Sequence, residues 1–193
     1  MDKKKTALLL DLAATNDGYV SVAEAKAYGI AQTYLCAAEE AGLFAKVSKG
    51  LYLKKGFERD RFYELFFRYH KAVFSLRSAL FLHGLSDGET LAVNLPSNYL
   101  TKGIEGIACR HVGEKEYGLG QSLVVTPRGN LVNSYDLERT LIDLLRYNES
   151  FSKEEFLSLW LRGKGKSPYP EKLLSYAEAF HVDGELRLMM RLY

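Results

Sequence analysis

The sequence has little cysteine, and its apolar runs are all short. Two cysteines, Cys36 and Cys109, are present among 193 residues. They are too few for a disulfide framework or a four-cysteine zinc site, which favours a reducing compartment and a fold without structural metal. No apolar run approaches the roughly 18 residues of a membrane span. The run that follows the first lysines stops at Asp11 without a cleavage site, so we expect a cytoplasmic protein with no membrane partner.

The sequence also has little net charge. Lys and Arg total 26 and Asp and Glu total 24, giving a formal net charge of +2. No strong field of the whole protein is available to attract nucleic acid or anionic lipid, so any such binding must come from a local patch. The length and the 47% hydrophobic content are sufficient for one large or two small domains with real cores.

Charge composition changes along the chain. Residues 1–57 contain eight Lys, no Arg and six acidic residues, whereas residues 58–150 are rich in Arg and aromatic side chains. This shift, next to the Lys54-Lys55-Gly56 segment, predicts a boundary between one domain of residues 1–57 and a second of residues 58–193.

The first 57 residues have the pattern of a small helical domain with a hairpin. Apolar spacing and turn residues predict helices over 3–15, from 22 to about 28 and over about 31–41, then strands over 43–47 and 51–53. Ser21 and Glu24 fit a capping box that starts the second helix, and Gly29 suits the tight turn that ends it. Helix, helix, helix, hairpin is the order of a winged helix-turn-helix.

This arrangement places candidate DNA contacts on two elements. The third helix of such a domain enters the major groove and the hairpin touches the neighbouring backbone. The candidates for base edges are Gln32, Thr33 and Tyr34. The candidates for phosphates are Lys46, Lys49, Lys54 and Lys55. The third helix also carries Glu39 and Glu40 and no cation, so an alternative stays open: a protein-interaction module whose winged helix no longer binds DNA specifically.

The second segment predicts an α+β domain. Its aromatic and leucine spacing predicts an amphipathic helix over 59–70, with Arg59, Asp60 and Arg68 facing outward. Strands are expected over 91–95, 107–112, 123–126 and 130–133, and helices over 76–83, 136–145, 153–162 and 171–180. These elements form a small, mostly antiparallel sheet packed by helices.

The helix after Tyr135 contains the most distinctive residues of this segment. Arg139 and Asp143 have the i, i+4 spacing of an ion pair. The carboxylates of Asp136, Glu138 and Asp143 suggest a metal-dependent nuclease or nucleotidyltransferase, but their helical positions point in different directions and no glycine-rich phosphate loop accompanies them. We therefore expect no catalytic residues, no metal and no cofactor.

Motifs in both segments resemble those of a known family. They are Gly18-Tyr-Val20, the segment from Ala41 to Tyr52, Ser75–Leu85 and Tyr135–Asp143. In this order they resemble the AbiEi-type antitoxins of type IV toxin–antitoxin systems. The resemblance implies a bacterial regulator whose first domain represses its own operon at inverted repeats in double-stranded DNA. It also implies a second domain that counteracts a nucleotidyltransferase-like toxin, directly or indirectly, in abortive-infection phage defence, and no catalytic activity in the antitoxin itself.

Overall fold

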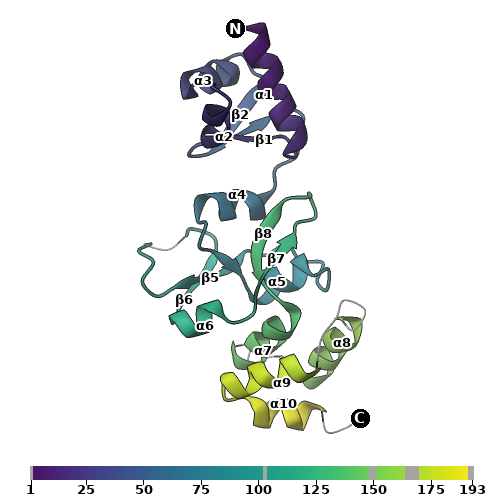
Figure 1. Cartoon of the computed structure of the whole chain (residues 1–193). Helices are drawn as coiled ribbons and strands as arrows, with labels where there is room; N and C mark the ends of the chain where they lie inside the picture. The colour runs from purple at the N-terminus through teal and green to yellow at the C-terminus, as the bar shows by residue number, and fades with distance from the viewer. Residues whose placement is uncertain (1, 102–103, 148–150, 164–169, 191–193) are drawn as a thin grey trace. The chain divides into compact units, whose positions relative to one another are not determined.

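The chain folds into two compact units (Figure 1). The computed structural model describes residues 2–101, 104–147, 151–163 and 170–190. The first unit comprises Met1–His70 together with Val125–Val132. The second comprises Lys71–Val124 and Asn133–Tyr193.

The first unit has the predicted order of elements. These are α1 (Lys3–Thr15), β1 (Tyr19–Ser21), α2 (Val22–Ala27), α3 (Gln32–Glu40), β2 (Phe44–Ser48), β3 (Leu51–Lys54) and α4 (Arg61–Arg68). The strands form an antiparallel sheet of order β1-β3-β2. The segment that forms β1 was expected only as an extended link, and it pairs with β3 as the third strand of the winged-helix sheet.

Local chemistry sets the ends of α2. The Ser21 hydroxyl accepts a hydrogen bond from the Glu24 amide at 3.1 Å, and the Glu24 carboxylate accepts one from the Ser21 amide at 2.9 Å, so the predicted capping box is present. Gly29 has φ +74° in the turn before α3. Leu35 and Ala38 turn the buried face of α3 onto the core of this unit.

The first unit extends beyond the boundary expected at residue 57. Asp60 was expected to face outward, and that expectation is wrong, because its side chain is only 2% exposed. One of its carboxylate oxygens accepts a hydrogen bond from the Tyr63 amide and caps α4. The other accepts hydrogen bonds from Thr126 Oγ1 at 2.6 Å and Asn130 Nδ2 at 2.9 Å. Burial of this carboxylate ties both α4 and the turn of residues 125–132 to the first unit.

The second unit combines a sheet with helices. Its elements are β4 (Val73–Phe74), α5 (Leu76–Leu82), β5 (Ala92–Pro96), β6 (Ala108–Val112), α6 (Glu114–Gly118), β7 (Gln121–Val125), β8 (Leu131–Tyr135), α7 (Leu137–Tyr147), α8 (Lys153–Gly163), α9 (Pro170–Ala179) and α10 (Asp183–Met190), with the turn between β7 and β8 belonging to the first unit. The sequence analysis did not predict α6 or α10.

The α+β class is confirmed, but the second sheet is mixed rather than mostly antiparallel. The strand order is β6-β5-β4-β8-β7. β4 pairs antiparallel with β5, whereas β5 pairs parallel with β6 and β4 pairs parallel with β8. The connection between β5 and β6 has the turn composition of a hairpin, yet it is long enough to return the chain for parallel pairing.

The helices of the second unit pack around α7. This helix contacts α5, α8 and α9. Their shared core includes Leu80, Leu141, Phe156, Trp160 and Leu173. Among the described residues, no helix is both long and apolar enough to cross a membrane.

Candidate nucleic-acid interface

The helix-turn-helix is formed by α2 and α3, and two of the predicted base contacts lie in the first turn of α3. Gln32 and Thr33 are exposed. A Gln side chain presents a donor and an acceptor together, which matches the N6 and N7 atoms of adenine in the major groove. The first turn of α3 therefore has the chemistry that base contacts require.

Tyr34 lies next to these residues but its hydroxyl is engaged with α1. It donates a hydrogen bond to the Asp2 carbonyl oxygen at 2.6 Å and lies 2.8 Å from Thr6 Oγ1. The ring packs against the core of the first unit. The structure thus separates Tyr34 from the two residues that the sequence grouped with it.

The four predicted phosphate contacts form two groups along the hairpin. Lys46 on β2 and Lys49 in the following turn are exposed. Lys54 and Lys55 lie at the opposite end of β3, a strand of four residues that spans about 13 Å. The Lys54 ammonium lies 5.5 Å from the centre of the Phe57 ring, whereas Lys55 is exposed.

The acidic end of α3 contacts the wing. Glu39 Oε1 accepts a hydrogen bond from the Lys46 amide at 3.2 Å. This carboxylate therefore braces the hairpin against α3. Glu40 is exposed in the last turn of α3, away from Gln32 and Thr33.

Two further groups near α3 were not assigned to the interface from the sequence. Lys26 in the last turn of α2 and Tyr28 directly after that helix are exposed, and Tyr28 is 58% exposed. Lys3, Lys4 and Lys5 are exposed in the first turn of α1, which Tyr34 joins to α3. These lysines are visible in the sequence, but no pattern in it predicts that the start of α1 lies beside α3.

Under the wing, burial raises the pKa of one tyrosine. Burial, with a smaller contribution from the hydrogen-bonding contact to the Cys36 thiol, raises the pKa of Tyr52 to about 12. Tyr52 belongs to the core of the first unit and therefore supports the hairpin.

A comparison with protein families matches this same part of the chain. Residues 7–53 match the family model AbiEi_4, described as "Transcriptional regulator, AbiEi antitoxin". This segment is similar to AbiEi antitoxin regulators. The match spans α1 to β3, less than half of the chain, and confirms the resemblance over the two motifs of the first segment. The AbiEi family indicates a transcriptional regulator and antitoxin of a toxin–antitoxin system. A comparison with curated proteins finds no match.

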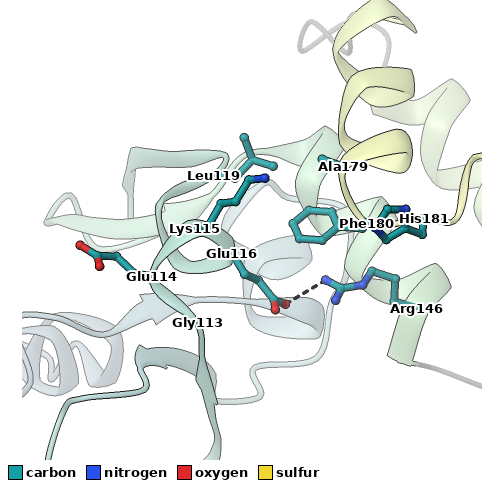
Figure 2. Close-up of a pocket in the computed structure, with 9 residues that line it drawn as sticks. All are labelled: Gly113, Glu114, Lys115, Glu116, Leu119, Arg146, Ala179, Phe180 and His181. Atoms are coloured by element: carbon teal, nitrogen blue, oxygen red, sulfur yellow. Dashed lines mark hydrogen bonds and ion pairs between the residues drawn. The ribbon is translucent and has the colours of Figure 1, made fainter.

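Outside the residues of the family match, the second unit contains a pocket of about 400 Å³ (Figure 2). It is lined by Gly113, Glu114, Lys115, Glu116, Leu119, Arg146, Ala179, Phe180 and His181. Arg146 donates to Glu116 Oε1 at 2.9 Å across the pocket wall and packs its guanidinium 4.1 Å from the centre of the Phe180 ring. Burial alone raises the pKa of Glu116, but hydrogen bonds from Tyr147 and Arg146 outweigh it and hold that pKa below its usual value.

Arg139 lies beside this wall and is fully buried. It donates to Asp143 Oδ1 at 2.9 Å and to the carbonyl oxygens of Glu116 and Leu119. The predicted i, i+4 ion pair is therefore confirmed within α7. The hydrogen bonds of Arg139 to the two carbonyl oxygens join α7 to the segment around α6. Its Nε and Nη1 atoms donate hydrogen bonds, whereas Nη2 has no hydrogen-bond partner among the described residues and lies 3.7 Å from Glu116 Oε1. The bonded atoms of this guanidinium contribute to the cohesion of the second unit.

The three carboxylates considered for catalysis are engaged in ion pairs, two of them with the same lysine. Lys172 lies 2.9 Å from Asp136 and 3.8 Å from Glu138, whereas Asp143 is paired with Arg139. Within the described ranges, no three His, Cys, Asp or Glu side chains are grouped to hold a metal ion. Ion pairing between elements is what this cluster supplies.

Proposed function

We propose that this protein is a DNA-binding autorepressor and the antitoxin of a type IV toxin–antitoxin system. The observation that carries the proposal is the exposed first turn of α3, with Gln32 and Thr33, beside a wing that presents Lys46 and Lys49, in a domain that matches AbiEi regulators. Gln32 and Thr33 contact base edges of operator DNA with inverted repeats. Lys46 and Lys49 on the wing, together with Lys54 and Lys55 at the other end of β3, neutralise phosphates. The second domain, proposed to begin after residue 57, counteracts a nucleotidyltransferase-like toxin, directly or indirectly, in the cytoplasm.

Fluorescence anisotropy of the full chain on its own upstream DNA and on a scrambled duplex, at several salt concentrations, tests the repressor half. We expect salt-sensitive binding that prefers the upstream DNA. Gln32→Ala should reduce that preference, whereas Lys49→Ala should weaken binding to both duplexes and make the log–log salt slope shallower by about 1. Lys153→Ala in α8 is the matched control and should leave both properties unchanged.

The acidic end of α3 favours one competing function, a protein-interaction module without specific DNA binding. No preference for the upstream DNA at any salt concentration would support that module and reject the repressor. The antitoxin half is tested separately by growth of cells that express the nucleotidyltransferase-like toxin with this chain. Gln32→Ala should still restore growth, because the proposal assigns toxin neutralisation to the second domain.

A further inference from the structure

We propose that the first turn of α1 is a third part of the DNA interface, and that Tyr34 holds it beside α3. In this arrangement Lys3, Lys4 and Lys5 contact backbone phosphates next to the groove that α3 enters. We call these three residues the α1 lysines. The inference rests on the proposed DNA binding and adds residues that the winged-helix pattern in the sequence did not assign.

A compact hydrogen-bond cluster places the α1 lysines next to α3. The Asp2 carbonyl oxygen accepts hydrogen bonds from the Tyr34 hydroxyl at 2.6 Å and from Thr6 Oγ1 at 2.8 Å. The two hydroxyls lie 2.8 Å apart. Tyr34 immediately follows Gln32 and Thr33, so the start of α1 is fixed against the same turn of α3 that presents the base contacts.

The positive charge at the start of α1 comes from lysine side chains. The Asp2 carboxylate already accepts hydrogen bonds from the Lys4 and Lys5 amides, at 2.8 and 3.4 Å, so these backbone groups of α1 are capped. The α1 lysines are exposed, and in the part of the chain that the structure describes none of them forms an ion pair. The three lysine ammonium groups outnumber the single Asp2 carboxylate, so the start of α1 has a local excess of positive charge.

This excess of positive charge compensates for the absence of cations on α3. The helix that would enter the groove carries no Lys or Arg. A duplex presents a phosphate strand along each edge of its major groove, which is about 12 Å wide. The wing provides cations from one element and the α1 lysines provide them from another, so α3 has cations on neighbouring elements although it has none itself.

The Tyr34 hydroxyl links α3 to the start of α1. The Lys5 ammonium lies 6.0 Å from the centre of the Tyr34 ring. Because this ring packs on the core, its position is fixed, and its hydroxyl transmits that position to the start of α1. Tyr34 is therefore a positioning residue, and the α1 lysines are the phosphate contacts.

The test compares the full-length triple variant Lys3→Gln, Lys4→Gln and Lys5→Gln with a control that changes net charge equally. The control is Lys71→Gln, Lys115→Gln and Lys153→Gln, three lysines of the second unit. With upstream and scrambled duplexes in anisotropy titrations, we expect the α1 variant to make the log–log salt slope shallower by up to about 3 and to leave the ratio of the two affinities unchanged. The control should keep the slope of the wild-type protein.

Tyr34→Phe tests the link while keeping the ring in the core. We expect weaker binding to both duplexes at an unchanged circular dichroism spectrum. Adding Tyr34→Phe to the triple lysine variant should cause little further loss, because both changes act on the same contact. If the wild-type protein binds DNA but the triple variant keeps its salt slope, the inference is wrong and the proposed function stands. If the wild-type protein binds neither duplex, both are wrong.

Discussion

At the scale of single residues, the most consequential side chain of the second unit is Arg139. It is fully buried, its guanidinium pairs with Asp143, and it stacks 4.3 Å from the centre of the Tyr135 ring and 4.2 Å from that of Phe180. Burying a guanidinium is tolerated only when charge and hydrogen bonds compensate for the lost water. The i, i+4 spacing predicted the partner, but the spacing is equally compatible with a solvated surface pair.

Arg139→Gln should lower the free energy of unfolding by about 3–5 kcal/mol, because it leaves the buried Asp143 carboxylate without its main counter-ion. Urea denaturation measures this change. Arg187→Gln is the control, since Arg187 is 55% exposed and lies 3.7 Å from Glu178, and it should cost at most about 0.5 kcal/mol. Equal losses in the two variants would contradict the role given to Arg139.

The side chain of Tyr34 contacts α1, although its place in the sequence suggested a base contact. The sequence placed it among the base contacts because it follows Gln32 and Thr33 at the start of a helix. One residue further along a helix points about 100° away, and here that rotation turns the side chain from the exposed surface toward α1. Its partner at Asp2 is 32 positions distant, so no local pattern reveals it.

At the scale of elements, α4 depends on a cap that also serves another segment. Asp60 accepts the Tyr63 amide at 3.0 Å as an ordinary N-cap does, and its second oxygen holds the turn through Thr126 and Asn130. The Asp60 amide in turn donates to the Tyr19 hydroxyl at 2.6 Å. A helix start, a strand and a distant turn therefore meet at one residue.

Asp60→Ala should reduce the free energy of unfolding by about 2–4 kcal/mol, since the change removes a helix cap and leaves two buried donors unpaired. Thermal denaturation of the full chain measures it. Asp2→Ala provides a matched comparison at an exposed cap, where we expect a loss of about 1 kcal/mol. If both substitutions cost the same, the carboxylate of Asp60 acts as a cap alone.

The strands of the second sheet were predicted more accurately than their pairing. The positions of β5, β6, β7 and β8 follow the predicted runs closely, but the direction of pairing does not. Hydrophobic alternation identifies a strand and its buried face. It does not identify the neighbour, because that depends on the path of the connections and on the helices that cover the sheet.

At the scale of the whole molecule, the chain passes between the two units three times. It leaves the first unit after His70, returns for Val125–Val132 and leaves again. The returning turn is anchored by Asp60, and Arg128 forms an ion pair with Glu58. The first unit is therefore completed by residues that lie far along the chain from the segment that matches the family model.

Thr126→Val should consequently loosen the first unit, although residue 126 lies over 70 positions beyond the family match. The substitution keeps the shape of the side chain and removes the hydroxyl that donates to Asp60. We expect amide hydrogen exchange in α4 to become about tenfold faster, with little change in α8 to α10. Faster exchange spread uniformly over the whole chain would contradict this local effect.

The local features of this protein follow from short-range patterns in its sequence. The sequence predicted the winged-helix order, the Ser21 capping box, the turn at Gly29 and the Arg139–Asp143 pair. Each depends on helical period, turn chemistry or spacing within a few residues. Four other features depend on tertiary packing: the burial of Asp60, the parallel pairing of β5 with β6, the inclusion of residues up to His70 in the first unit and the contact of Tyr34 with α1. These features join residues tens of positions apart, where packing and the satisfaction of buried polar groups select among faces and partners that local patterns leave equivalent.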